Sequence, residues 1–381
     1  MKFPNFGKKP PKLPLTYIQG VVSTPSQEFI GVFDTASSIS WVASDQCQSR
    51  ACLNSFDDRK FHSRESYTNL KFPFFVDLSY IDGTHIRIKP ELDVLTFGGF
   101  SLPPHLIGEA FEIDYPKGYL PPANARIGMG GFGSIDWIKT GLSIDRNALP
   151  LISHIFKNKR AVGDDRFSTG YISSGSENFR KRGPVQSELF ESFAWIVGVD
   201  KSLYHGPIYD LSLAPMHGLR SPFWNIPILG IDFQYNNRTS GNTTFSFKLA
   251  SNAYGKVYSS SPMLTVPEEI AEKMNTALGA VYDENLNIYT ISCSAYLTAP
   301  NLVFRFDDGV HAEIPPEQFI YRLEQRSKTK GCYTAIAGGP DSSRIFLGGP
   351  FFRSFYLVYQ FRNFKVGIAE SIAKAGKVYK L

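Results

Sequence analysis

Asp34 is the residue of this sequence whose setting best suits chemistry. It follows two apolar residues, Val32 and Phe33, which are typical of the end of a strand, and it precedes a run that is rich in small hydroxyl residues, including Thr35 and Ser37. An acid at the head of such a turn is usually held by backbone N–H groups and hydroxyls. These few residues fit an ordinary Asp-Thr turn equally well, so the rest of the chain must decide between a structural and a chemical Asp34.

The composition indicates a mainly β protein. A chain of 381 residues is long enough for two ordinary domains or one large one, with a sizeable core. Aromatic residues make up 14% of it, and 25 Pro and 32 Gly accompany them, which is typical of strands and turns. The formal charge of +5 is small, and the basic clusters at residues 157–160 and 180–182 lie among turn residues. We expect solvated loops there and no nucleic-acid partner.

The four cysteines form one close and one distant pair along the chain: Cys47, Cys52, Cys293 and Cys332. An even number of cysteines fits disulfides, and zinc binding is the competing use. No histidine has ligand-like spacing near either pair, and neither pair is a Cys-x-x-Cys, so we expect no metal and no cofactor. Two disulfides would require an oxidising compartment.

The predicted location is secreted or endolysosomal. Asn237-Arg-Thr239 and Asn242-Thr-Thr244 are N-glycosylation acceptor tripeptides, which agrees with secretion. Residues 1–14 form a basic, proline-rich arm without an apolar stretch, so the sequence as given carries no signal peptide. Either the numbering begins after processing or the chain is cytosolic, and we favour processing. No later run is long and apolar enough to span a membrane.

The elements around Asp34 begin with a predicted hairpin, residues 17–22 and 28–33, that delivers this acid at its end. The motif runs Thr24-Pro25-x-Gln27-x-Phe29, then Phe33-Asp34-Thr35-Ala36-Ser37-Ser38, then Trp41-Val42. It resembles the N-terminal catalytic segment of the pepsin-like aspartic proteases. Tyr80, within residues 78–84, resembles the tyrosine of that family's flap, although a strand aromatic paired across a hairpin would look the same.

The resemblance extends from about residue 15 to residue 369. Residues 125–131 and 344–349 resemble the two apolar-Gly strands of the family, and the cysteines then correspond to its disulfides Cys47–Cys52 and Cys293–Cys332. The glycines of the first strand also suggest a dinucleotide loop, but no β-α-β pattern surrounds them. The resemblance implies two β-barrel-like lobes, residues 15–185 and 186–381, with a central cleft.

The second catalytic loop of the family corresponds to residues 256–267 of this chain. Val257 precedes the loop, Leu264-Thr265-x-Pro267 closes it, and Tyr258 stands where the family has its second aspartate. In pepsin the two carboxylates share one proton. An aspartate titrates near pH ~3.9 and a tyrosine near pH ~10, so Tyr258 and Asp34 would share no mobile proton. A phenol is also a poor base, and its ring could fill the place of the attacking water.

Further departures from the family pattern accompany Tyr258. Ala36 and Ser260 replace the glycines of the two loops, and Asn124 replaces an aspartate. In the family, cross-lobe hydrogen bonds at two hydroxyl positions brace the two loops. Thr35 and Ser259 keep hydroxyls at these two positions. The residues predicted to line the cleft or brace its loops are Trp41, Tyr80, Thr35, Ser37, Ser259 and Ser261.

We therefore predict a monomeric, catalytically inactive relative of the pepsin-like proteases that binds a peptide or protein ligand in its cleft. The alternative is an active or weakly active endopeptidase that works at acid pH with another acid, such as Asp283 or Glu284, swung into the second loop. A purely structural secreted role cannot be separated from the first reading by sequence. No Gly-x-Ser-x-Gly motif is present, and the seven histidines are scattered singly.

Overall fold

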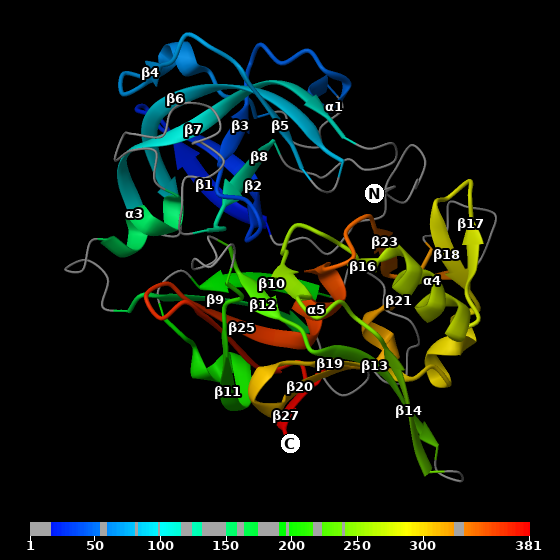
Figure 1. Ribbon diagram of the computed structural model, residues 1–381. Helices are drawn as coiled ribbons and strands as arrows, with labels where there is room; N and C mark the ends of the chain where they lie inside the picture. The colour runs from blue at the N-terminus through cyan, green and yellow to red at the C-terminus, as the bar shows by residue number, and fades with distance from the viewer. Residues whose placement is uncertain are drawn as a thin grey trace.

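Two β-rich lobes make up the molecule, with the blue and cyan strands of the N-terminal lobe lying above the green to red elements of the C-terminal lobe (Figure 1). This arrangement confirms the predicted fold class. The predicted N-terminal arm and the predicted lobe boundary at residue 185 lie outside the described residues. The computed structural model describes residues 17–53, 59–80, 83–97, 100–115, 124–131, 150–157, 164–173, 190–195, 198–215, 223–237, 241–323 and 331–381.

The N-terminal lobe is one eight-stranded sheet that closes on itself. Its strands follow the order β1-β2-β8-β3-β7-β6-β4, with β5 added to β6, and β1 also pairs with β6. The predicted hairpin is β1 and β2, with Val22 opposite Gln27. The strands are β1 (Tyr17–Val22), β2 (Gln27–Asp34), β3 (Trp41–Ala43), β4 (Leu70–Lys71), β5 (Val76–Ser79), β6 (His85–Phe97), β7 (Phe100–Asp114) and β8 (Ala125–Gly128).

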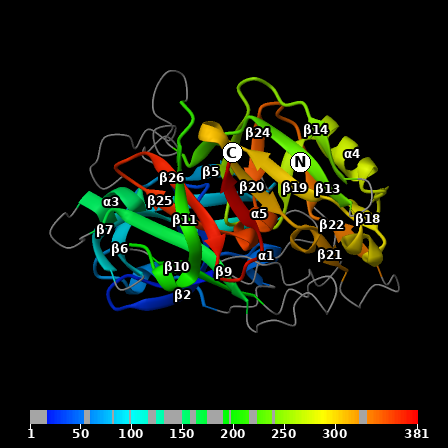
Figure 2. The same ribbon diagram turned by 90° about the horizontal axis from the view of Figure 1, so that it is seen from below.

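A five-stranded sheet joins the two halves of the chain (Figure 2). Its order is β10-β9-β25-β26-β11, so β9 from the first half pairs with β25 near the C-terminus. The ring of Phe167 on β9 stacks on Tyr359 of β25 at a centroid distance of 4.2 Å, which buries aromatic surface at this junction. The strands are β9 (Arg166–Ser173), β10 (Phe190–Trp195), β11 (Tyr204–Ser212), β25 (Phe355–Gln360) and β26 (Lys365–Ser371).

Three further sheets build the C-terminal lobe. The sheet that supports the cleft has β12 (Asn225–Pro227), β15 (Tyr254–Val257), β24 (Arg344–Leu347), β16 (Leu264–Pro267) and β23 (Ile336–Gly339) in that order. The second contains β14 (Gly241–Phe247), β13 (Gly230–Asn237), β19 (Asn301–Arg305), β20 (Val310–Ile314) and β27 (Lys377–Lys380). The third contains β17 (Val281–Asp283), β18 (Ile288–Ile291), β22 (Cys332–Thr334) and β21 (Ile320–Arg322).

The helices are short and none that the structure describes is long and apolar enough to cross a membrane. The longest, α4, buries Ile270, Ala271 and Met274 on one face, as expected of an amphipathic helix on a sheet. The α-helices are α1 (Arg50–Leu53), α3 (Leu151–Lys157), α4 (Glu268–Ala277) and α5 (Gly349–Ser354). The 3-10 helices are η1 (Ser63–Glu65), η5 (Lys201–Leu203), η6 (Cys293–Leu297), η7 (Asp307–Gly309) and η8 (Pro316–Gln318).

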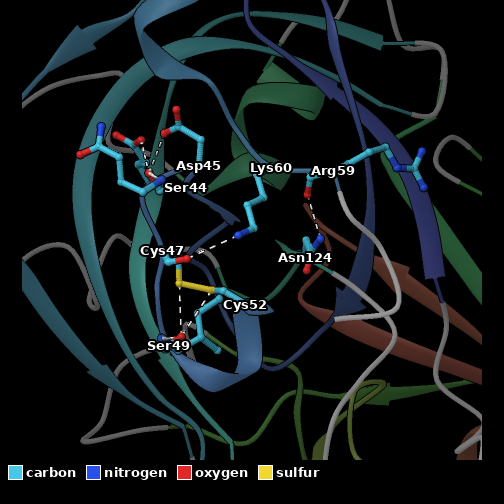
Figure 3. The surroundings of a disulfide bond; sticks show 11 residues. Ser44, Asp45, Cys47, Ser49, Cys52, Arg59, Lys60 and Asn124 are labelled. Carbon is cyan, nitrogen blue, oxygen red and sulfur yellow. Dashed lines mark hydrogen bonds between the residues drawn. A yellow bond between two sulfur atoms is a disulfide. The ribbon is translucent and has the colours of Figure 1, made fainter. Parts of the chain in front are cut away.

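Two disulfides connect the four cysteines. The bond between Cys47 and Cys52 closes the turn into α1, where Ser49 lies beside both sulfur atoms (Figure 3). The bond between Cys293 and Cys332 joins η6 to β22 across 39 residues. The longer loop contributes more to stability, because closing it removes more conformational freedom from the unfolded chain.

Candidate functional site

The first half of the site is the turn that follows β2. The strand ends at Asp34, which lies in register with Gly128 of the parallel strand β8. Beyond β8, Met129 donates its backbone N–H to Asp34 O at 2.7 Å, and Gly130 donates to Ser37 O at 2.7 Å. The chain after β8 therefore runs beneath the turn and holds its backbone by hydrogen bonds. These bonds fix the direction in which the Asp34 side chain leaves the strand.

The second half of the site is the turn that follows β15, and it is built in the same way. Val257 ends that strand in register with Leu347 of the parallel strand β24. Tyr258 donates its backbone N–H to Leu347 O at 3.1 Å, and Gly349 donates to Ser261 O at 2.8 Å. A strand end and a parallel apolar-Gly strand thus position Tyr258, as they position the acid of the other lobe.

The two turns share an internal hydrogen bond that sets their correspondence. Ser37 Oγ accepts a hydrogen bond from the N–H two residues later at 3.2 Å, and Ser261 Oγ does the same at 3.3 Å. Both serines are buried. Asp34 and Tyr258 each stand three positions before their serine, so these two side chains occupy equivalent places in the two lobes.

A buried brace links the turns across the lobes. Thr35 N donates to Ser259 Oγ at 3.0 Å, and Ser259 N donates to Thr35 Oγ1 at 3.1 Å. Each hydroxyl also donates a hydrogen bond of its own: Thr35 Oγ1 donates to Val257 O at 2.9 Å, and Ser259 Oγ donates to Phe33 O at 2.5 Å. Since every one of these groups is buried and paired, the brace fixes the spacing of the two loops.

The Asp34 carboxylate is held by a cation from the strand beside it. Its Oδ1 accepts a hydrogen bond from Ala36 N at 2.8 Å, and its Oδ2 accepts one from Arg126 Nη1 at 3.0 Å. The two side chains of this ion pair are 0% and 2% exposed. Burial makes a charged pair strongly interdependent, because a charge left alone in a dry environment is very costly. None of the described contacts of the Asp34 carboxylate is another carboxylate.

Arg126 is not among the residues that the sequence predicts for the site. It lies on β8 opposite Val32 of β2, two positions before Gly128, which is the residue opposite Asp34. A single arginine inside the apolar run of residues 125–129 is a signal that could have marked it, because a charged residue in a buried strand needs a partner. The register of two strands 92 residues apart then makes Asp34 that partner.

Tyr80 covers the ion pair from the flap. It follows β5, and the turn that leads to β6 is closed by hydrogen bonds from Tyr80 N to Thr84 O at 2.8 Å and from Gly83 N to Tyr80 O at 3.0 Å. The guanidinium carbon of Arg126 lies 4.1 Å from the centre of the Tyr80 ring, which is a cation–π contact. Burial of the hydroxyl raises the pKa of Tyr80 to about 12, and the Asp34 charge also raises it, against the opposing effect of Arg126.

A cavity of about 620 Å³ lies between these parts, with walls from both lobes. Asp34 and Tyr258 both line it, although Tyr258 is only 2% exposed and packs its ring against Phe346 at a centroid distance of 5.8 Å. The other lining residues are Ala36, Ser37, Ile39, Phe74, Phe75, Val76, Asp77, Leu78, Ser79, Tyr80, Phe223, Lys256, Arg344 and Phe346. The arrangement is a flap-covered, aromatic cleft with one acid on its floor.

Comparison with known proteins decides the family. Residues 16–371 match the family described as eukaryotic aspartyl protease. The chain belongs to the eukaryotic aspartyl protease family. It is 26% identical to Pepsin-2B of Gadus morhua over 356 residues, which cover 93% of this chain and 96% of that protein. It is also 26% identical to Pepsin A of Rhinolophus ferrumequinum over 352 residues and to gastricsin of Cavia porcellus over 359 residues, covering 91% of this chain and 79% and 78% of those proteins.

Three residues that the sequence suggests for the site of this aspartyl protease relative do not line this cavity. Trp41 is 1% exposed and does not line the cavity, because β3 lies between β7 and β8 and its side chain packs into the core behind Tyr80. Asp283, the acid imagined for the second loop, lines a separate cavity of about 310 Å³ beside Cys332. Its neighbour Glu284 lines neither cavity.

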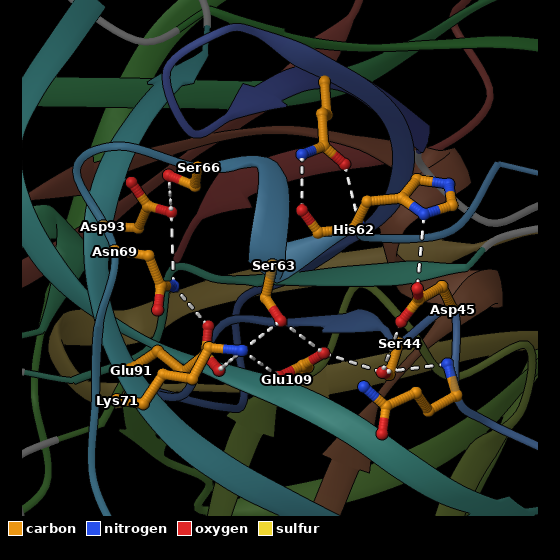
Figure 4. Close-up of polar contacts among 12 residues, drawn as sticks. Ser44, Asp45, His62, Ser63, Ser66, Asn69, Lys71, Glu91, Asp93 and Glu109 are labelled. Atoms are coloured by element: carbon orange, nitrogen blue, oxygen red, sulfur yellow. Dashed lines mark hydrogen bonds and ion pairs between the residues drawn. The ribbon is translucent and has the colours of Figure 1, made fainter.

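A buried acidic cluster in the N-terminal lobe stands apart from the cleft (Figure 4). Glu91 of β6 and Glu109 of β7 are both 0% exposed, and Lys71 Nζ lies 3.8 Å and 3.9 Å from their carboxylates. Ser63 Oγ and Ser44 Oγ donate to Glu109 Oε1 at 3.0 Å and 2.7 Å. Burial, followed by the hydrogen bond and charge of Glu109, raises the pKa of Glu91 to about 9. One of the two carboxyls therefore keeps its proton at neutral pH.

The described residues hold no group of three or more His, Cys, Asp or Glu side chains that could bind a metal ion.

The two N-glycosylation acceptors lie on one hairpin of the C-terminal lobe. Asn237 ends β13 opposite Gly241, and Asn242 lies on β14. Glycosylation of these two residues stays a prediction, which a mass measurement can test.

Proposed function

We propose that this member of the aspartyl protease family is catalytically inactive and binds a peptide segment in its cleft. The observation that carries the proposal is the pairing of the lone floor acid: Asp34 is engaged by the buried Arg126 guanidinium at 3.0 Å, while its equivalent in the other lobe is the phenol of Tyr258. The chemistry of the family depends on two acids in those places.

The ion pair of Asp34 with Arg126 and the replacement of the second aspartate by Tyr258 each remove a different part of the proteolytic reaction. Aspartic proteolysis needs one carboxylate to take a proton from water while the other acid donates one to the scissile carbonyl. Both oxygens of the Asp34 carboxylate already accept hydrogen bonds, Oδ1 from Ala36 N at 2.8 Å and Oδ2 from Arg126 Nη1 at 3.0 Å, so the Arg126 guanidinium occupies the side of Asp34 that would otherwise serve a second acid. A phenol with an ordinary pKa of ~10 keeps its proton at acid and neutral pH and so cannot replace the missing carboxylate.

Peptide binding does not depend on those protons, and the groups that support it are in place. The brace between Thr35 and Ser259 holds the two loops, and the flap residue Tyr80 is fixed over Arg126. The cleft offers aromatic side chains from both lobes. An extended peptide between a flap hairpin and a cleft floor would gain main-chain hydrogen bonds and side-chain pockets. These aromatic cleft residues are Phe74, Phe75, Phe223, Tyr258 and Phe346.

The second candidate function is weak endopeptidase activity at acid pH. The observation in its favour is that Asp34 keeps the backbone hydrogen bond from Ala36 and the braced loop of an active site. Acid cleavage by the unmodified protein, blocked by pepstatin and lost in Asp34→Asn, would establish this function in place of the first.

The proposal is tested by restoring the missing chemistry. Tyr258→Asp and the double variant Tyr258→Asp/Arg126→Ile are compared with the unmodified chain for cleavage of a denatured protein from strongly acid to neutral pH. We expect no cleavage by the unmodified chain, little by the single variant and measurable acid cleavage by the double variant, because only the double variant frees Asp34 to share a proton. Arg126→Ile alone is the control that should stay inactive. Cleavage by the unmodified chain contradicts the proposal.

We further propose that the protein acts as a monomer in a secreted or endolysosomal compartment. The two disulfides support an oxidising environment during folding. The acceptors Asn237 and Asn242, on β13 and β14, support passage through a glycosylating pathway. A loss of mass after endoglycosidase treatment of protein from its native source would support this location, and an unchanged mass would count against it.

A further inference from the structure

The flap hairpin is joined to the rest of the N-terminal lobe through one strand. Among the strands that the structure describes, β5 pairs with β6 alone, so it lies at an edge of the sheet. Val76, Leu78 and Tyr80 alternate along the flap and pack against the same core cluster of this lobe. Tyr80 is the one of the three that lies nearest the turn, and its position therefore determines how far the flap covers the cleft.

Arg126 contacts Asp34 and Tyr80 at the same time. A guanidinium is planar, so its N–H groups can bind a carboxylate in the plane while its faces stay available to an aromatic ring. Arg126 Nη1 donates to Asp34 Oδ2 at 3.0 Å, and Arg126 Cζ lies 4.1 Å from the centre of the Tyr80 ring. The two contacts use different parts of one guanidinium, so neither has to be broken for the other to form.

The floor that holds Tyr80 is more firmly fixed than the flap. Arg126 lies on β8, which is inside the eight-stranded sheet between β2 and β3, and Asp34 ends β2 beside it. The Asp34 and Arg126 side chains are 0% and 2% exposed. A cation–π contact is stronger when it is removed from water, and the Asp34 charge makes a buried guanidinium tolerable. Asp34 therefore determines where the guanidinium lies, and with it Tyr80.

We propose that the Asp34–Arg126 ion pair holds the flap closed over the cleft. Asp34 is then a positioning residue, because it fixes Arg126, and Arg126 fixes Tyr80. A ligand that reaches the cleft floor must first displace Tyr80 from Arg126. The closed flap is a property of the protein without ligand, so this inference stands or falls independently of the proposed binding function.

The first test measures the position of the flap by pulsed electron paramagnetic resonance between two spin labels. All four native cysteines are in disulfides, so the labels attach only to introduced cysteines. Asp77→Cys labels the flap, and Asn252→Cys labels the chain before β15, both at exposed positions. We expect Tyr80→Leu to raise the population with the longer distance about tenfold or more, because the ring contact is lost. Tyr80→Phe keeps the ring and should match the unmodified flap. Equal opening in Tyr80→Phe and Tyr80→Leu would assign the closure to the hydroxyl and overturn the inference.

The second test asks whether the floor pair is the anchor. Asp34→Asn/Arg126→Met removes both charges and leaves none buried alone, and it should open the flap as far as Tyr80→Leu does. Adding Tyr80→Leu to this double variant should open the flap no further, because the three side chains act as one unit. Labels at Ser101→Cys and Asn252→Cys report movement between the lobes and should show no change in any variant. A flap that stays closed in the double variant, or opening that adds up in the triple variant, overturns the inference.

Discussion

At the scale of residues, the floor of the cleft is organised around a buried ion pair. Asp34 and Arg126 are almost fully buried, and Tyr80 covers them. The charge on each is tolerable only because the other is present. Removing either partner would therefore leave an uncompensated charge on the floor of the cleft.

Replacing Arg126 by Ile should destabilise the protein by about 3–5 kcal/mol at neutral pH, because the Asp34 charge is left buried and unpaired. Denaturant unfolding at neutral pH measures the effect. The control is Arg126→Ile/Asp34→Asn, which removes both charges and should recover much of the loss. Equal destabilisation of the single and double variants would show that the two charges are not coupled.

The brace supplies a second prediction at this scale. Thr35→Val removes a hydroxyl that accepts from Ser259 N and donates to Val257 O, so both buried partners lose a hydrogen bond. We expect a loss of about 2–3 kcal/mol in the free energy of unfolding. Thr290→Val, which removes an exposed hydroxyl that donates to a backbone carbonyl, is the matched control and should cost much less. Similar losses in both variants would show that the buried brace stabilises the protein no more than an exposed hydrogen bond does.

At the scale of elements, neighbouring strands and a helix bring ionisable side chains into contact. Glu91 on β6 and Glu109 on β7 form the acidic cluster behind the flap strands. His105 on β7 contacts His154 on α3, with 3.1 Å between their Nδ1 atoms. Each contact ties two elements of the N-terminal lobe, and each makes that tie sensitive to pH.

Glu91 should make the protein less stable as pH rises. Its pKa is raised from the ordinary value of 4.5 to about 9, so between these values the native state binds a proton that the unfolded state releases. The free energy of unfolding must therefore fall across this window as the pH increases. Glu91→Gln keeps a neutral hydrogen-bonding group and should flatten the slope. A slope that is unchanged in Glu91→Gln would assign the effect to other groups.

His105 should make the protein less stable in acid. Burial, helped by the neighbouring His154, lowers the pKa of His105 from 6.5 to about 3. The unfolded state then binds a proton below 6.5 that the native state refuses, so stability falls as the pH drops towards 3. His105→Gln should shift the acid-unfolding midpoint, followed by circular dichroism, to lower pH. An unshifted midpoint would contradict this role.

At the scale of the whole molecule, the architecture was more predictable than the electrostatics of its cleft. Composition alone indicated a mainly β protein, and the family resemblance carried by the motifs around Asp34 and Tyr258 implied two lobes. Each motif is a local stretch of sequence, and it predicts the turn and strand that this stretch forms. The Asp34–Arg126 pair depends on which strand lies beside β2 and in what register, and the same is true of the buried place of Trp41. Those contacts are non-local, so no local pattern could specify them.

The molecule as a whole keeps the two-lobed scaffold of the aspartyl protease family around its cleft. The two loops lie more than 200 residues apart along the chain and meet in one buried network of hydrogen bonds. The Asp34 carboxylate is paired with Arg126 on the floor of the cleft, and the proposed ligand-binding function rests on that pairing.

The most direct measurement is cleavage of a denatured protein by the unmodified chain in acid, with pepstatin added and with Asp34→Asn in parallel. We expect the unmodified chain to match Asp34→Asn at every pH, and pepstatin to change nothing. Acid cleavage that pepstatin blocks and that Asp34→Asn abolishes would contradict the account, because Asp34 would then act as a catalytic acid despite its pairing with Arg126.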